Sequence, residues 1–138
     1  MVGGLWLAFA TLAASPVSAQ DGFHLVPLDE AQFFAAEGSP VELAVLWGDP
    51  TDGPVAFHLK LPAGFPGGMH FHSQDYHAAV VSGQHSHWLE GEDPGEANGP
   101  GTYYFQPGGQ VHQDANFGDE EVILFIFFPV GFDTTFVE

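Results

Sequence analysis

Two histidines separated by one residue, His70 and His72, are the first candidates for chemistry in this chain. On a β-strand alternate side chains share one face, so both imidazoles point in the same direction and can bind one metal ion. A third histidine, His77, follows in the same short segment. Exposed strands also carry histidine pairs, so this pair predicts a metal site only where further ligands support it.

The charge balance narrows the choice of ligands and partners. The sequence has 18 Asp and Glu against a single Lys or Arg, which is Lys60, and a net charge of −17. A nucleic acid needs Lys and Arg to replace its counterions, and an anionic membrane surface would repel this acidic protein, so we expect neither as a partner. Arginine normally binds carboxylates and phosphates, and its absence predicts a neutral or cationic small-molecule ligand. Cysteine is also absent, which excludes disulfides, thiolate metal sites and a cysteine nucleophile.

The N-terminal residues are typical of an export signal. Residues 5–14 (LWLAFATLAA) form an apolar run too short to span a membrane, and residues 17–19 (VSA) fit a cleavage site for a signal peptidase. We therefore predict a signal peptide over residues 1–19 and a single mature domain over residues 20–138. The mature protein is expected to be periplasmic or secreted, with no membrane contact after cleavage.

The pattern of the mature chain predicts an all-β domain. The full sequence has 18 Gly and 11 Pro, which separate short apolar runs as in a sandwich or barrel. One short helix is predicted from Leu28 to Gly38, with Asp29 as its cap. Strands are predicted over residues 41–48, 55–61, 77–82, 85–89, 102–107 and 121–130. The run at 85–89 is expected to form a hairpin with the run at 77–82.

A longer sequence motif supports the interpretation of His70 and His72 as metal ligands. Residues 101–116 read GTYYFQPGGQVHQDAN, which resembles the second sequence motif of the cupin superfamily. The positions in register with that motif are Gly101, Pro107, Gly109, His112 and Asn116. The positions in register with the first cupin motif are Gly64, His70, His72 and Gly83.

This resemblance implies a single-domain cupin, which is a jelly-roll β-barrel with a metal ion inside. It also implies that His70, His72 and His112 are the metal ligands, and that the protein pairs as a homodimer. A closer resemblance is to a cupin family known only as a domain of unknown function. It rests on LWGDP (46–50), LPAGF (61–65), DYHAAVVSG (75–83) and YYFQPGGQVH (103–112). The resemblance to that family does not indicate which reaction, if any, the protein catalyses.

The sequence leaves the fourth metal ligand open. Cupins carry an acidic ligand seven residues before the closing glycine of the first motif, and relative to Gly83 this position is Tyr76. The alternative is His77, which would give a site of four histidines. Adjacent residues of a strand face opposite ways, so only one of the two points inward, and the position of Gly83 favours Tyr76.

Two more histidines follow the closing glycine. A tight hairpin turn at Gly83 would place His85 and His87 on the same face as Tyr76. On an inward face, either histidine could complete the metal shell or act as a general base. The alternative is an exposed polar hairpin.

Three imidazole ligands suit Zn, Fe, Mn, Ni or Cu and leave coordination positions open, as catalytic metal sites do. Dioxygenases and isomerases are well represented among cupins, so the resemblance implies an oxygenase or isomerase for a small neutral or phenolic compound. Tyr76 and His87 are the catalytic candidates, with Tyr104 and Gln106 as further polar groups. The alternative function is a non-catalytic, exported module that binds a metal or a ligand.

Overall fold

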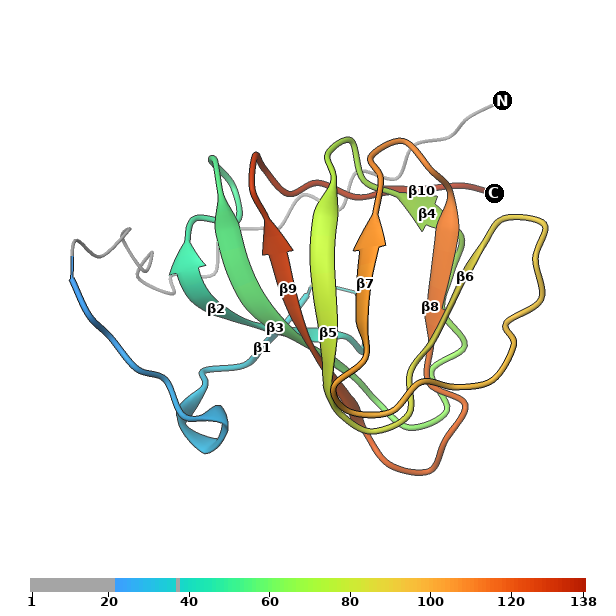
Figure 1. Cartoon of the computed structure of the whole chain (residues 1–138), viewed down its shortest axis with the longest axis horizontal. Helices are drawn as coiled ribbons and strands as arrows, with labels where there is room; N and C mark the ends of the chain where they lie inside the picture. Colours follow the sequence, from blue (N-terminus) through green and yellow to red (C-terminus); the bar gives the residue numbers. More distant parts are fainter. Residues whose placement is uncertain (1–21, 37) are drawn as a thin grey trace.

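The computed structural model describes residues 22–36 and 38–138, and nearly all regular structure there is β-strand (Figure 1). A single turn of 3-10 helix, η1 (Leu28–Glu30), comes first. The strands that follow are β1 (Phe34–Ala35), β2 (Glu42–Gly48), β3 (Val55–Leu61), β4 (His70–Phe71), β5 (Tyr76–Ser82), β6 (Ser86–Leu89), β7 (Tyr103–Gln106), β8 (His112–Ala115), β9 (Val122–Phe128) and β10 (Thr135–Phe136). The predicted all-β class is confirmed.

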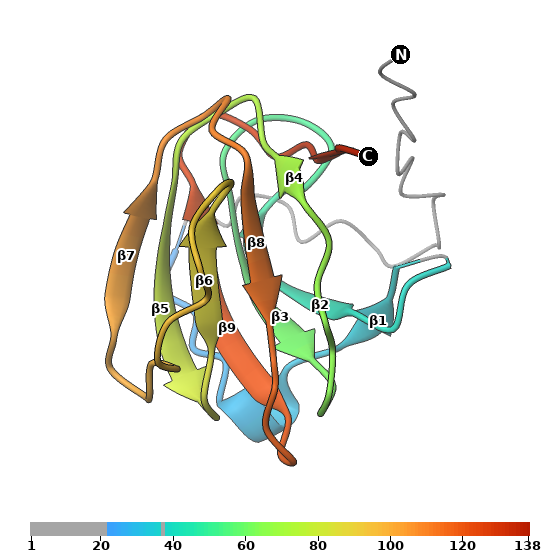
Figure 2. The same ribbon diagram turned by 90° about the vertical axis from the view of Figure 1, so that its right-hand side faces the viewer.

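The strands form two antiparallel sheets. The large sheet has six strands in the order β1-β2-β3-β9-β5-β7, and the small sheet has four in the order β10-β4-β8-β6. Figure 2 shows the small sheet lying over one face of the large sheet. Among the described residues no strand pairing joins the two sheets, so the predicted jelly-roll appears as two facing sheets and not as a closed barrel.

The core lies between the two sheets and is built by strands with apolar residues on the inner face. In β3, Val55, Phe57 and Leu61 are almost completely buried. The neighbouring strand β9 adds Leu124 and Phe128, and the rings of Phe57 and Phe128 stack with centroids 6.1 Å apart. Burying each such side chain contributes about 1.5–3 kcal/mol, so this layer gives the site a rigid floor.

The helix predicted from Leu28 to Gly38 is wrong. Only η1 is helical, its first turn has no side-chain cap, and Ala31 already has an extended backbone. Phe34 instead pairs with Leu43 in the β1–β2 ladder. A helix of this length is marginal in water, so pairing with the edge of the large sheet outweighs the local helical pattern.

The hairpin predicted between the runs at 77–82 and 85–89 is also wrong. Strand β5 pairs with β7 and β9 in the large sheet, whereas β6 pairs with β8 in the small sheet. The chain passes from one sheet to the other at Gly83, which has a φ of +82°. A Cβ there would lie 2.5 Å from the carbonyl oxygen of Glu121, so the crossing requires glycine.

The predicted signal peptide, residues 1–19, lies outside the described residues. Within the part of the chain that the structure describes, no helix has the length and apolar character needed to cross a membrane.

Candidate metal centre

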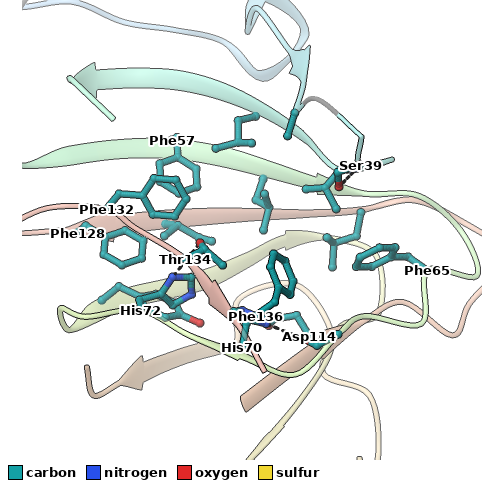
Figure 3. A pocket seen from close by; sticks show the side chains of 18 residues that line it. Ser39, Phe57, Phe65, His70, His72, Asp114, Phe128, Phe132, Thr134 and Phe136 are labelled. Atoms are coloured by element: carbon teal, nitrogen blue, oxygen red, sulfur yellow. Dashed lines mark hydrogen bonds and ion pairs between the residues drawn. The ribbon is translucent and has the colours of Figure 1, made fainter. Parts of the chain in front are cut away.

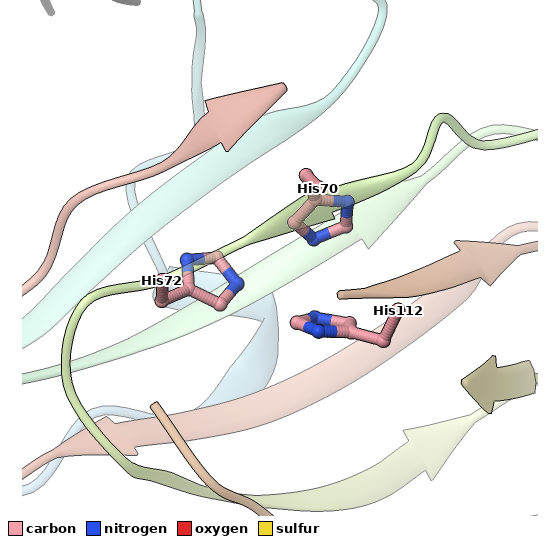
Figure 4. A group of neighbouring side chains, drawn as sticks. All are labelled: His70, His72 and His112. Atoms are coloured by element: carbon pink, nitrogen blue, oxygen red, sulfur yellow. The ribbon is translucent and has the colours of Figure 1, made fainter. Parts of the chain in front are cut away.

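Three histidines meet between the two sheets. His70 in β4 and His112 in β8 are direct cross-strand partners, and His72 follows immediately after β4. One ring nitrogen from each of the three lies within 4.8 Å of the others. Figure 4 shows the three rings turned toward a common point. The structure therefore brings together the three ligands that the cupin resemblance implies.

Backbone carbonyls fix the orientation of each ring. The Nδ1 atoms of His70, His72 and His112 lie 2.7, 2.6 and 2.9 Å from the carbonyl oxygens of Gly68, Asp133 and Gln110, respectively. A carbonyl oxygen only accepts, so each Nδ1 carries the proton and each Nε2 keeps its lone pair. Metal-binding histidines are held in this way, with one ring nitrogen donating to an outer partner and the other free for the metal.

Burial keeps the imidazoles of His72 and His112 neutral. Desolvation lowers the pKa of His72 to about 3, and the neighbouring His70 adds to the shift. Desolvation also lowers the pKa of His112 to about 4, although the nearby carboxylate of Asp114 opposes the shift. The neutral imidazole is the form that binds a metal, so at neutral pH both rings are ready to act as ligands.

Tyr76 and His77 lie on opposite faces of β5. The ring of Tyr76 is buried, and its hydroxyl lies 3.2 Å from Nε2 of His112. The ring of His77 lies on the outer face of the large sheet, where its Nδ1 is 2.8 Å from the hydroxyl of Tyr103. The inward residue is thus Tyr76, and His77 does not reach the three histidines. Burial raises the pKa of Tyr76 well above 10, so its hydroxyl is a neutral donor.

The neighbouring strand β7 contributes two more inward polar side chains. Gln106 and Tyr104 pair with Tyr76 and Ala78 of β5 and so share their face. The Tyr104 ring stacks on His87 with a centroid distance of 4.2 Å, and Gln106 Oε1 lies 2.8 Å from His87 Nε2. The predicted catalytic candidate His87 therefore faces the interior, although it belongs to the small sheet and not to a hairpin with β5.

Sequence analysis missed one residue of this site, Asp114. It lies directly opposite His87 in the β6–β8 ladder, and its side chain is buried. Although burial alone would raise it, hydrogen bonds from His85 and His87 hold the pKa of Asp114 well below its usual range. The sequence did carry a signal, because Asp114 stands two residues after His112 and alternate residues of a strand share a face.

An apolar cavity of about 130 Å³ opens beside the histidines (Figure 3). His70, His72, Tyr76 and Asp114 form part of its wall. Most of the remaining wall is aliphatic and aromatic, including Phe57, Phe65, Leu61, Ile126, Phe128 and Phe136. No Lys or Arg lies among the described residues that line it. This cavity suits a small apolar molecule with one polar group directed at the histidines.

The donor set fits a divalent transition metal ion. Three imidazole nitrogens suit Zn, Fe, Mn, Ni or Cu, and His70, His72 and His112 would hold such an ion next to the cavity.

Structural comparison finds the same fold in solved proteins. KdgF from Halomonas sp. is 22% identical with a TM-score of 0.61, over 77% of this chain and 94% of that chain. The polyketide cyclase RemF from Streptomyces resistomycificus is 19% identical with a TM-score of 0.68, over 85% and 87% of the two chains. The DMSP lyase DddQ from Ruegeria pomeroyi is 22% identical with a TM-score of 0.58, over 72% of this chain and 56% of that chain. At these identities the likeness concerns the fold alone.

Sequence comparison identifies the family. No curated protein sequence matches this chain. Residues 20–128 match the family described as domain of unknown function DUF4437, and further solved neighbours are described as RmlC-like cupins. The predicted family is confirmed: the chain belongs to the DUF4437 family, and its fold is that of the RmlC-like cupins.

Proposed function

We propose that this protein is a metal-dependent enzyme, an oxygenase or isomerase that acts on a small neutral or phenolic compound. The observation that carries the proposal is the set of three imidazoles, those of His70, His72 and His112, whose Nε2 atoms converge beside an apolar cavity. A divalent ion bound by these nitrogens supplies Lewis acidity and open positions for oxygen or for an oxygen atom of the substrate.

The cavity selects the substrate class. A volume of about 130 Å³ is close to that of apolar protein cavities of about 150 Å³ that hold benzene. Phe57, Phe128 and Phe136 would pack against a ring and exclude water from it. Without a Lys or Arg in the wall, a carboxylate or phosphate would lose its hydration and gain no cationic side chain in return. A neutral ring that carries one hydroxyl fits these requirements best.

Tyr76 is the better placed of the two catalytic candidates. It lines the cavity, and its neutral hydroxyl can donate a hydrogen bond to a substrate oxygen next to the histidines. His87 has both ring nitrogens within 2.8 Å of protein oxygen atoms, those of Asp114 and Gln106. We therefore assign proton donation to Tyr76, and to His87 a role in positioning Asp114.

The proposal also covers the localisation and the partners of the protein. The apolar N-terminal run supports an exported protein, periplasmic or secreted, and the net charge of −17 argues against nucleic acid as a partner. We also propose a homodimer, on the basis of the cupin family alone. A mass equal to one chain in light scattering would remove the homodimer and leave the metal centre untouched.

A non-catalytic binding module is the second candidate. It is favoured by Tyr76, because a phenol stands where the first cupin motif has an acidic ligand. A weaker metal site could serve to capture a ligand without turnover.

Oxygen consumption and product formation over a panel of phenols would separate the two candidates. The metal-loaded protein should turn over at least one compound, and activity should disappear after chelation and in His72→Gln. The matched control is His77→Gln, which removes an imidazole on the outer face and should keep full activity. Saturable binding of phenols without turnover, in every metal form, would reject the enzyme and support the binding module.

A further inference from the structure

Asp114 is a single carboxylate enclosed between the two sheets, next to the three histidines. Asp114 is 8% exposed, and its carboxylate is hydrogen-bonded to His85, His87 and Tyr104 and lies within 4 Å of His70 and His112. A buried carboxylate is stable only where a positive charge or several donors compensate it. Its surroundings therefore indicate what it binds.

The two oxygen atoms of Asp114 have different partners. Oδ1 accepts from Nε2 of His85 and from Nδ1 of His87, each at 2.8 Å, and lies 3.4 Å from the hydroxyl of Tyr104. Oδ2 faces the other way, 3.6 Å from Nε2 of His70 and 3.9 Å from Nε2 of His112. One oxygen is thus held by donors, and the other is directed at the lone pairs of the predicted metal ligands.

The distances at Oδ2 are slightly longer than those between neighbouring ligands on one ion. Ligand atoms with bonds of about 2.1 Å to a shared ion lie roughly 3.0–3.5 Å apart. The separations of 3.6 and 3.9 Å from His70 and His112 are only slightly longer, so a small shift brings Oδ2 into the same coordination shell. Figure 3 shows Asp114 beside His70 at the wall of the cavity.

His85 and His87 compensate the carboxylate of Asp114 at Oδ1, whereas no Lys side chain in the described part of the chain faces Oδ2. The only Lys of the chain, Lys60, lies 3.9 Å from Glu42 and 3.9 Å from the ring centre of Phe33, so it is engaged elsewhere. A divalent ion between the three histidines would face Oδ2 directly and compensate the carboxylate.

We propose that Asp114 is the acidic ligand of the metal centre, and that His85 and His87 position its carboxylate through Oδ1. The proposal rests on the proposed metal site of His70, His72 and His112. In this assignment the acidic ligand comes from β8, two residues after His112, and not from the position in β5 that Tyr76 occupies. The centre then has three imidazoles and one carboxylate.

A second ion bound by His85, His87 and Asp114 is a different arrangement of the same groups, since their ligand atoms also lie within 4.8 Å of one another. We favour hydrogen bonding there, because both rings approach the same oxygen atom at 2.8 Å, and the other nitrogen of His87 is 2.8 Å from Gln106 Oε1. The two arrangements differ in the number of ions bound per chain.

Cobalt(II) titration of the full-length protein tests this inference, with metal stoichiometry, affinity and the visible absorption spectrum of bound cobalt as readouts. Asp114→Asn keeps the size of the side chain but removes its charge. It should weaken cobalt binding at least 10-fold and change the absorption spectrum of bound cobalt, because one ligand of the ion is replaced. His85→Gln should weaken binding and leave the band positions close to those of the wild type. Asp119→Asn, at an exposed aspartate, is the matched control and should change nothing.

The outcomes separate the inference from the proposed metal site. Wild-type protein that binds one cobalt ion, together with an Asp114→Asn variant of equal affinity and spectrum, would overturn the role of Asp114 and leave the three-histidine site standing. Two ions per chain, one of them lost in His85→Gln, would overturn the single centre. A wild type that binds no cobalt would overturn both proposals. Circular dichroism of each variant establishes that a loss of binding is not a loss of fold.

Discussion

The hydroxyl of Tyr76 donates a hydrogen bond to Nε2 of His112 over a distance of 3.2 Å. Because Nδ1 of His112 donates to the carbonyl of Gln110, Nε2 offers a single lone pair. That lone pair is the one a metal ion would use. The residue that stands at the acidic position of the first cupin motif therefore competes with the metal for a ligand atom.

Tyr76→Phe should keep the metal and bind it as tightly as the wild type or up to about 10-fold more tightly. The substitution removes the competing hydrogen bond, which contributes about 0.5–1.5 kcal/mol, and keeps the ring that stacks on Phe128. Competition with a coloured chelator measures the affinity. A variant that no longer binds metal would instead make Tyr76 the fourth ligand.

The metal-free protein should lose stability as the pH falls from about 6.5 to about 4. The pKa values of His72 and His112 are lowered to about 3 and about 4 in the folded state, so the unfolded chain binds more protons in this window. Acid therefore favours unfolding, by up to about 1.4 kcal/mol per pH unit for each histidine. His87 does not oppose this, because its raised pKa leaves it protonated in both states below pH 6.5.

Urea denaturation of chelator-treated protein at pH 7 and pH 5 measures this effect. His72→Gln should show a smaller loss between the two pH values than the wild type, because one of the two protons no longer binds. Equal losses in the two proteins would contradict the assignment of the shifted pKa to His72.

Asn116→Ala should destabilise the fold by about 2–3 kcal/mol. The side-chain amide of Asn116 donates to the carbonyls of Leu61, Pro62 and Glu120, and its oxygen accepts from the backbone of Gly118. Removal of the side chain takes away all four hydrogen bonds, including the buried one to Leu61. Urea midpoints compared with Asn98→Ala, at an exposed asparagine, provide the measurement. A midpoint equal to that of the control would show that the motif asparagine is not structural.

Gly67→Ala should weaken metal binding, whereas Gly64→Ala should not. Both glycines have a positive φ, 78° and 73°, so both variants carry the left-handed strain of about 1–2 kcal/mol. Only at Gly67 would the new Cβ collide with another strand, 2.0 Å from the carbonyl oxygen of Asp114. Nothing lies within 4 Å at Gly64. Cobalt affinities of the two variants test this, and equal values would contradict the coupling of Gly67 to β8.

Strands with a clear pattern could be predicted from the sequence alone. The alternation in residues 55–61 and the apolar run at 121–130 correspond to β3 and β9, which form the centre of the large sheet. The predicted helix failed because Phe34 gains more by pairing with Leu43 than an isolated helix gains from its own hydrogen bonds. Strand β4 has only two residues, too few for a pattern, and the cupin motif alone placed His70.

Of the residues in the candidate site, only those at cupin motif positions could be predicted from the sequence. The resemblance to the two cupin motifs placed His70, His72 and His112 next to one another and Tyr76 inward, as the structure shows. Asp114 was missed because it belongs to no motif position, and its importance depends on β6 crossing to the small sheet, where His87 becomes its direct partner. Such a long-range pairing is not encoded in the local pattern of either strand.

Elemental analysis of protein purified without a histidine tag is the most direct test of the central claim. We predict close to one equivalent of a divalent transition metal in the wild type, its loss in His72→Ala, and its retention in His77→Ala. Iron, manganese, nickel or copper would direct the assays to oxygen chemistry, and zinc to isomerisation or binding. A wild type without metal, or metal that persists unchanged in His72→Ala, would contradict the three-histidine centre.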